Sequence, residues 1–194
     1  VMTGPEIAAE FGDEVALLVD GVTKLTQIDY VADKVEMQAE NLRKMFLAMA
    51  KDIRVILIKL ADRLHNMRTM QYQTLIKQKE KSTETLDIYA PIADRLGISK
   101  VKVELDDLSF KYLEPEMYKQ LEKSLEQGKV KRHEFIAKIV AEVRSHIAAA
   151  GIKATIDGRA KHYFSIYKKM VTQNKKLDQI YDLFAVRIIV ETVK

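Results

Sequence analysis

Arg54-Val-Ile-Leu-Ile-Lys-Leu-Ala-Asp-Arg-Leu-His-Asn-Met-Arg-Thr69 is the stretch that decides the fold of this chain. It opens with an apolar run, and Asp62, Asn66 and Thr69 follow in its second half. At about 100° per residue, these three side chains fall within roughly 60° of one another on a helix. Burying polar side chains without partners is costly. The stretch therefore predicts one buried helix over 53–69, with the three side chains lining a common cavity for a metal or a polar ligand.

The composition is that of an ordinary globular protein. The chain has 194 residues, 47% hydrophobic and 31% charged, with a net charge of +4, which is enough for one large domain or two small ones. No apolar run approaches the roughly 20 residues of a membrane span, and the first ten residues do not resemble a signal peptide. We therefore expect a cytoplasmic protein. Cysteine is absent, so a metal would have to use His, Asp or Glu.

Helix signals dominate the first 150 residues. Pro5 and Pro115 are placed as first-turn residues, Pro91 is expected to kink or divide a helix over 83–96, and Gly97 is typical of a helix C-cap. Residues 41–70 predict two helices with a break near Lys51-Asp52. Further helices are expected over 103–113, 115–128 and 129–150, the last one ended by Gly151.

The pattern changes to mixed α/β after Gly151. Residues 152–156 alternate apolar and polar side chains, which predicts a half-buried strand. Gly158 is expected to open a turn into a helix over 162–174, and the β-branched run 183–190 predicts a buried strand. Two strands and a helix or two make too little core to stand alone, so we expect this unit to continue past Lys194.

Five further motifs are spaced along the chain beside Leu60-Ala-Asp-Arg-Leu-His-Asn-Met-Arg-Thr69. They are Val19-Asp-Gly-Val-Thr-Lys-Leu25, Asn41-Leu-Arg-Lys-Met-Phe-Leu-Ala-Met-Ala50, Tyr89-Ala-Pro-Ile-Ala-Asp-Arg-Leu-Gly97, Gly158-Arg-Ala-Lys-His-Tyr-Phe-Ser-Ile-Tyr-Lys-Lys-Met170 and Ile180-Tyr-Asp-Leu-Phe-Ala-Val-Arg187. In this order they resemble motifs of the RelA/SpoT family of bifunctional (p)ppGpp synthetase/hydrolases. The resemblance covers nearly the whole chain.

The resemblance implies a mainly α fold that passes into a mixed α/β domain. Residues 1–112 would be the C-terminal part of an HD (p)ppGpp hydrolase domain, 113–151 connecting helices, and 152–194 the opening of a nucleotidyltransferase-like synthetase domain. The family takes the His-Asp pair of the HD domain from residues upstream, and the catalytic Glu of the synthetase from residues downstream. Both ends of the chain therefore look cut, and neither catalytic site is expected to be complete within it.

The resemblance assigns roles in the hydrolase half to the polar stripe. Asp62 would be a ligand of Mn(II), a metal that suits a hard carboxylate oxygen and would acidify the attacking water. Asn66 and Thr69 would contact the nucleotide, whereas the family does not use His65 as a ligand. From the residues alone, Asp62 could equally pair with Arg63 or a neighbouring helix, and Asn66 and Thr69 could hydrogen-bond between helices.

The basic stretch 159–176 holds six cationic residues and no carboxylate. We expect Arg159 and Lys161 in the turn before the helix, with Ser165 and Lys169 on its first turns, where free N–H groups favour anions. By resemblance these four residues grip the phosphates of ATP. Ala160 replaces the proline usual in the family motif, which predicts a looser turn. A solvated basic helix face would show the same charges.

Asp182 matches the position of the Mg(II)-binding Asp of the synthetase. It is expected where a short helix over 177–181 gives way to the last strand. Mg(II) is usually held by one or two carboxylates together with phosphate oxygens, so a single Asp beside a cationic patch is chemically sensible. An ordinary turn or strand-end Asp is the alternative.

The function expected for the parent protein is alarmone metabolism. It would transfer pyrophosphate from ATP to GDP or GTP and hydrolyse the 3′-pyrophosphate of (p)ppGpp. We expect no membrane or DNA partner, and contact with the ribosome only through regions outside this chain. Two alternatives stay open: a catalytically incomplete fragment that acts only as an interaction or regulatory module, and an RNA-binding module suggested by the basic stretch.

Overall fold

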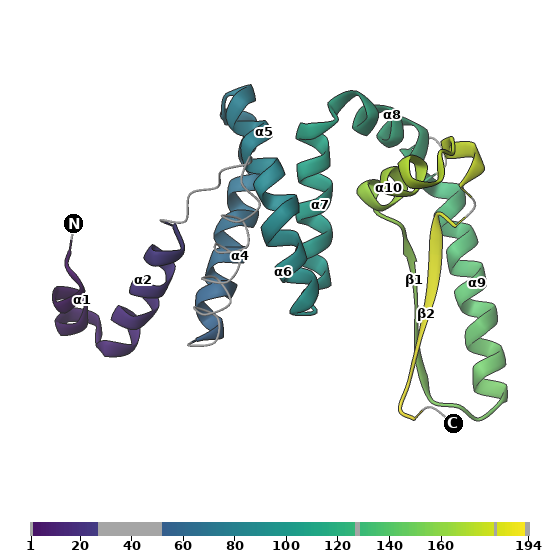
Figure 1. Cartoon of the computed structure of the whole chain (residues 1–194). Helices are drawn as coiled ribbons and strands as arrows, with labels where there is room; N and C mark the ends of the chain where they lie inside the picture. Colours follow the sequence, from purple (N-terminus) through teal and green to yellow (C-terminus); the bar gives the residue numbers. More distant parts are fainter. Residues whose placement is uncertain (1, 27–51, 127–128, 181, 193–194) are drawn as a thin grey trace. The chain divides into compact units, whose positions relative to one another are not determined.

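The structure, a computed structural model, describes residues 2–26, 52–126, 129–180 and 182–192 (Figure 1). The chain divides into two compact units, Val1–Ser109 and Phe110–Lys194. Helices make up most of the described residues, and two strands form an antiparallel sheet in the second unit. The mainly helical fold that passes into a mixed α/β region is confirmed. Among the described residues, no helix is both long and apolar enough to cross a membrane.

The first unit is built from helices and helical turns in succession. They are α1 (Gly4–Phe11), α2 (Asp13–Thr26), α4 (Ile53–Arg68), the 3₁₀ turn η1 (Met70–Tyr72), α5 (Leu75–Glu84), the π-helical turn η2 (Thr85–Tyr89), α6 (Ala90–Arg95) and the first part of α7 (Ser99–Leu113). The core of the unit lies between α4, η2, α6 and α7, where Ile56, Leu60, Met67, Ile92 and Leu105 are almost completely buried.

Helix α4 begins where the sequence predicts a break. Asp52 is its N-cap, and the Asp52 carboxylate accepts a hydrogen bond from the Arg54 backbone N–H at 2.9 Å. That bond satisfies one of the N–H groups that a helix start leaves without a partner. The first of the two helices predicted over 41–70 falls on residues 41–51, which lie outside the described residues.

Pro91 lies in a helical run that continues without a gap from α5 through η2 into α6, so the division predicted at Pro91 does not occur. A proline in a helix interior lacks an N–H donor, and its ring clashes with the carbonyl four residues earlier. Here the clash is avoided because η2 widens the helix by one residue per turn directly before α6, and the Ala90 N–H reaches back to the carbonyl of Thr85. Six residues of η2 and α6 remain buried: Thr85, Ile88, Tyr89, Ala90, Ile92 and Ala93.

Gly97 ends α6 with the predicted C-cap. Its φ of 72° lies in the left-handed region that favours glycine. The Gly97 N–H donates to the carbonyl of Asp94, and the Ile98 N–H donates to the carbonyl of Ala93, both at 2.9 Å. These two bonds form a Schellman motif, and the chain turns directly into α7.

The second unit packs helices beside a two-stranded sheet. Its elements after α7 are α8 (Pro115–Glu126), α9 (Lys129–Ala149), β1 (Ala154–Ala160), α10 (Tyr163–Gln173), the 3₁₀ turn η3 (Leu177–Gln179) and β2 (Phe184–Val190). Strands β1 and β2 are antiparallel, in a register that runs from Ala154 opposite Val190 to Ala160 opposite Phe184. Helix α9 lies along β1 (Figure 1).

A small aromatic core holds the end of α7, α8 and α10 together. Phe110, Leu121 and Ile166 are fully buried in it. The Phe110 ring stacks on that of Tyr167 with centroids 4.5 Å apart, and meets that of Tyr118 edge to face at 5.7 Å. This core fixes the first turns of α10, the helix that carries two of the predicted phosphate-binding residues.

The strand bounds predicted for the second unit are wrong in part. The first strand does not occupy 152–156 but 154–160, so Gly158 lies inside β1 and does not open a turn. The physical reason is pairing with β2, a long-range contact that extends β1 beyond its alternating segment. Strand β2 is not buried either: Ile188, Ile189 and Val190 are exposed, because two strands with α9 on one face cannot cover both faces.

Candidate functional site

The polar stripe forms along one side of α4. The Asn66 side-chain amide donates to the Asp62 carboxylate at 3.2 Å, so these two side chains point toward each other. Thr69 is the C-cap of the helix, and its hydroxyl donates to the carbonyl of His65 at 3.1 Å. One helix over 53–68 with Asp62 and Asn66 on one side confirms the helical part of the prediction, and Thr69 follows as its C-cap.

The burial predicted for this stripe is wrong. The Asp62 side chain keeps 53% of its accessible surface, and Asn66 and His65 are also exposed. The buried side of α4 is a different one, made of Val55, Ile56, Lys59, Leu60, Arg63 and Met67. The four apolar residues on that side pack into the core, whereas Asp62 and Asn66 lie on an exposed face of the helix and not in a closed cavity.

A buried ionic cluster fixes the opposite side of α4. The Arg63 guanidinium donates to both carboxylate oxygens of Glu84, at 2.7 and 3.1 Å, and lies 4.1 Å from the centre of the Tyr89 ring. Lys81 also donates to Glu84, at 2.9 Å. Sequence reasoning missed this cluster. The only local signal was a charged residue next to Asp62 on an apolar helix, and its partner is 21 residues away.

Lys59 lies between the buried side and the stripe. Its side chain is almost completely buried, yet its ammonium is 3.8 Å from the Asp62 carboxylate, one turn further along α4. Asp62 thus has an amide and an ammonium for neighbours on its own helix. The alternative in which Asp62 pairs with Arg63 does not occur, because Arg63 turns to Glu84.

In the second unit, two predicted phosphate-binding lysines converge on the predicted Mg(II) ligand. Lys161 in the β1–α10 link and Lys169 on α10 both donate to the same carboxylate oxygen of Asp182, Oδ2. Asp182 stands between η3 and β2. The Lys161 backbone N–H also donates to the carbonyl of Leu183 at 2.8 Å, which ties the two links together.

Arg159 is not in the turn where the sequence predicts it. It lies in β1 opposite Ala185, and its side chain is exposed. On the same face of the sheet, Asp157 is 3.3 Å from Arg187 of β2. Ser165 lies one turn before Lys169 on α10 and is half-buried. The structure therefore brings Lys161, Lys169 and Asp182 together and places Arg159 and Ser165 on the adjoining strand and helix.

The lysines keep the Asp182 carboxylate ionised. Hydrogen bonds from Lys161 and Lys169 hold the pKa of Asp182 well below its usual range. The same hydrogen bond to Asp182 raises the pKa of Lys169. With two lysines directed at one carboxylate, the cluster has a formal net charge of +1.

The described residues do not assemble a metal site from protein ligands alone. Within the four described ranges, no three His, Cys, Asp or Glu side chains lie close enough to hold a metal ion. Asp182 fits Mg(II) as a single carboxylate, since that ion commonly completes its shell with phosphate oxygens and water. Asp62 would supply one ligand of a Mn(II) site, and the other ligands are not among the described residues.

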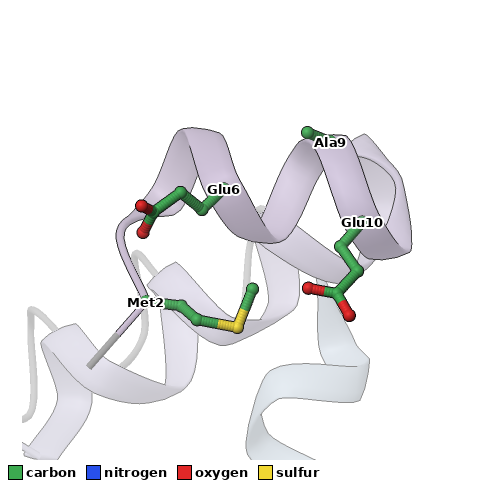
Figure 2. A pocket seen from close by; sticks show the side chains of 4 residues that line it. All are labelled: Met2, Glu6, Ala9 and Glu10. Atoms are coloured by element: carbon green, nitrogen blue, oxygen red, sulfur yellow. The ribbon is translucent and has the colours of Figure 1, made fainter.

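A hollow on the first unit contains none of the predicted site residues. It is lined by Met2, Glu6, Ala9 and Glu10 (Figure 2). The Glu6 carboxylate already accepts the Thr3 backbone N–H at 2.6 Å and the Thr3 hydroxyl at 2.9 Å. Glu6 therefore caps α1, and the hollow follows from the shape of that helix.

Two protein-family models match the chain in the order of its two units. Residues 2–99 match the HD domain, and residues 158–194 match the region found in RelA/SpoT proteins. The chain therefore belongs to the HD domain family and joins that domain to a RelA/SpoT region. Asp62, Asn66 and Thr69 fall in the first match, and the Lys161, Lys169 and Asp182 cluster falls in the second.

Curated relatives are similar to the chain over nearly its whole length. It is 49% identical over 189 residues to a GTP pyrophosphokinase of Streptomyces coelicolor and 50% identical over 192 residues to one of Myxococcus xanthus. It is 47% identical over 180 residues to the bifunctional (p)ppGpp synthase/hydrolase SpoT of Escherichia coli. These alignments cover 97%, 98% and 93% of this chain but 22%, 25% and 26% of the relatives. The resemblance predicted from the motifs is confirmed, and the chain spans about a quarter of the length of these relatives.

Proposed function

We propose that the protein to which this chain belongs both makes and degrades (p)ppGpp. It would transfer pyrophosphate from ATP to GDP or GTP, and it would hydrolyse the 3′-pyrophosphate of the product. The names of the relatives support both activities, since they include GTP pyrophosphokinases and a bifunctional (p)ppGpp synthase/hydrolase. A cytoplasmic location, where these nucleotides are made and used, belongs to the same proposal.

One observation carries the synthetase half: two lysines and one aspartate converge within the RelA/SpoT region. In the transfer, the 3′-hydroxyl oxygen of GDP or GTP attacks the β-phosphorus of ATP, the bond to the α-phosphate breaks, and AMP leaves. Negative charge on the phosphate oxygens needs fixed cations, and ammonium groups are suited to that task. Lys161 and Lys169 are positioned to supply them, with Arg159 on the adjoining strand.

Asp182 is the residue in this cluster that would hold Mg(II). The ion, when bound, would neutralise charge on the transferring phosphates. Asp182 supplies a hard oxygen ligand from the start of β2, and Ser165 offers a hydroxyl donor one turn before Lys169 on α10. Each residue of the cluster is thus assigned a separate task toward the same triphosphate.

The hydrolase half uses the open face of α4. Asp62 would contribute a carboxylate to a Mn(II) site that activates water, and Asn66 and Thr69 would contact the nucleotide. The hydrogen bond from the Asn66 amide to the Asp62 carboxylate supports this, because it places both side chains on one face of α4. The buried Arg63–Glu84 pair on the other side keeps that face turned outward.

ATP binding tests the synthetase proposal. Charge-assisted hydrogen bonds to phosphate contribute about 1.5–3 kcal/mol each, which is roughly one to two decades in affinity. Arg159→Ala or Lys169→Ala should therefore weaken binding of a non-hydrolysable ATP analogue by roughly that factor, with GDP binding nearly unchanged. Lys168→Ala is the matched control, since Lys168 is the exposed neighbour of Lys169 on α10. Unaltered ATP affinity in both variants would leave the basic stretch a solvated surface.

A second candidate function follows from the absence of a complete metal ligand set among the described residues. On that reading, this segment by itself contributes folding, interaction or regulation but no catalysis. Titration of the isolated chain with Mn(II), Mg(II) and ATP separates the two readings. Nucleotide affinity comparable to that of the whole protein favours the catalytic assignment, and its absence favours the interaction module.

A further inference from the structure

We propose that Asp182 determines which form of polyphosphate the site accepts, by holding Lys161 and Lys169 until a divalent cation takes its carboxylate. The site would then bind a metal-complexed triphosphate in preference to the free anion. This inference rests on the synthetase half of the proposed function and deepens it. It assigns to Asp182 a second task besides that of a metal ligand.

The contact geometry is the first support. Both ammonium groups donate to one oxygen, Oδ2 of Asp182, although Lys161 and Lys169 come from different elements. An anionic ligand that binds these ammonium groups must therefore compete with the carboxylate at both of them. The Asp182 side chain remains 48% exposed, and those of Lys161 and Lys169 remain 28% and 34% exposed, so a ligand can reach all three.

The backbone holds Lys161 close to Asp182 whether or not their side chains are paired. The hydrogen bond from the Lys161 N–H to the Leu183 carbonyl fixes the β1–α10 link against the start of β2. Ile180, two residues before Asp182, is buried. The carboxylate therefore stays within reach of any ligand bound to the lysines. Its negative charge would repel a free polyphosphate there.

A divalent cation would turn this repulsion between Asp182 and the polyphosphate into a net attraction. Magnesium is held in proteins by one or two carboxylates together with substrate phosphates. With the cation bound, Asp182 and the phosphate oxygens would both serve as its ligands, and both lysines would be free to donate to the phosphate. The same carboxylate that excludes the free anion thus favours the complexed one.

The test uses inorganic tripolyphosphate as the probe and isothermal titration calorimetry on the whole protein, in EDTA and in excess Mg²⁺. Wild type should bind the probe much more tightly with Mg²⁺ than in EDTA. Asp182→Asn removes the charge and keeps the shape. It should bind the probe in EDTA up to roughly fivefold more tightly than wild type, the upper limit expected when an exposed ion pair of about 1 kcal/mol is released. It should also gain little from added Mg²⁺.

Asp157→Asn is the matched control, because it removes one carboxylate of the same sheet that pairs with Arg187 and not with the lysines. It should leave both affinities unchanged. If Asp157→Asn gained as much affinity for tripolyphosphate in EDTA as Asp182→Asn, the change in net charge alone would explain the gain, and the proposal would be overturned. Asp182→Ser provides a second variant should the asparagine still bridge both lysines through its amide oxygen.

The outcomes separate this inference from the function on which it rests. If Asp182→Asn and Asp182→Ser bind free tripolyphosphate no more tightly than wild type, the exclusion role is wrong. Magnesium-dependent binding of ATP by wild type would then still support the synthetase. If wild type binds neither tripolyphosphate nor ATP under any condition, both proposals fail.

Discussion

Arg63 anchors helix α4 from the side opposite Asp62. It is adjacent to Asp62 in sequence but points to the other side of α4, where it meets Glu84 and the Tyr89 ring. Burial alone would lower the pKa of Arg63, and the nearby Tyr89 and Glu84 more than offset that effect. The pair connects α4 to the end of α5 and to η2. It thereby fixes the rotation of α4 about its axis, and with it the direction of Asp62 and Asn66.

Removing one partner of this pair should be more costly than replacing both. Arg63→Met leaves Glu84 buried with only Lys81 to compensate, and breaking a buried ion pair typically costs about 3–5 kcal/mol. We expect the free energy of unfolding to fall by about 2–4 kcal/mol, because Lys81 retains its contact. Urea unfolding of the chain measures this. The double variant Arg63→Met/Glu84→Leu should recover much of the loss, and a double variant worse than either single one would contradict the assignment.

Gly158 is required by the packing of strand β1 against helix α9. A Cβ at this position of β1 would lie 2.4 Å from Cγ2 of Ile136 and 2.8 Å from Cγ2 of Val140, both on α9. The strand can approach the helix this closely only without a side chain. Gly21 of α2 serves a similar close approach, since its Cβ would lie 2.8 Å from Cγ2 of Val55 on α4.

Gly158→Ala should therefore destabilise the second unit by about 1–3 kcal/mol, the usual cost of overpacking. Gly4→Ala is the control, because a Cβ at Gly4 meets no atom within 4 Å. Thermal unfolding compares the two variants. Addition of Ile136→Ala to Gly158→Ala should relieve part of the strain, so that the two effects are not additive. Strict additivity would mean that β1 does not press on α9.

Local signals predicted the elements better than their partners. Asp52, Gly97 and Pro115 act on the backbone within a few residues of themselves, and helix ends follow from them. The extent of β1 depends instead on β2, some 30 residues later, and so Arg159 was expected in a turn.

The candidate sites show the same division between local and distant signals. The spacing of Asp62, Asn66 and Thr69 predicted one shared side of α4, but which side is buried depends on Glu84 and Tyr89. The convergence of both lysines on a single carboxylate oxygen likewise depends on the fold of the second unit and has no signal in the sequence.

At the scale of the whole first unit, an ion pair ties α4 to α7. Arg68 donates to both carboxylate oxygens of Glu104, at 2.5 and 2.9 Å. The hydrogen bond from Arg68 lowers the pKa of Glu104 from its ordinary value of 4.5. A carboxylate whose pKa is depressed by folding adds stability above the pKa of the unfolded chain, and this is lost as the pH falls through the folded value.

The contribution of Glu104 to the free energy of unfolding should therefore decrease as the pH falls. Wild type should exceed Glu104→Gln in unfolding free energy by up to about 1 kcal/mol above pH 5, as expected for a solvent-exposed pair. The difference should shrink as the pH falls below 4.5, the ordinary value of Glu104. Urea midpoints measured between pH 3 and 7 test this. A difference that grows on acidification would contradict the sign.

The two proposed sites share no residue, and their losses should separate in the whole protein. Asp62 lies in the first unit, whereas Lys161, Lys169 and Asp182 lie in the second. Asp62→Ala should abolish hydrolysis of (p)ppGpp and leave its synthesis within about twofold of wild type, because removal of an exposed side chain usually changes stability by less than about 0.5 kcal/mol. Measuring both rates on one preparation tests this, with Glu80→Ala as an exposed-carboxylate control in the same unit. Equal loss of both activities in Asp62→Ala would indicate misfolding, and retained hydrolysis would remove Asp62 from the hydrolase site.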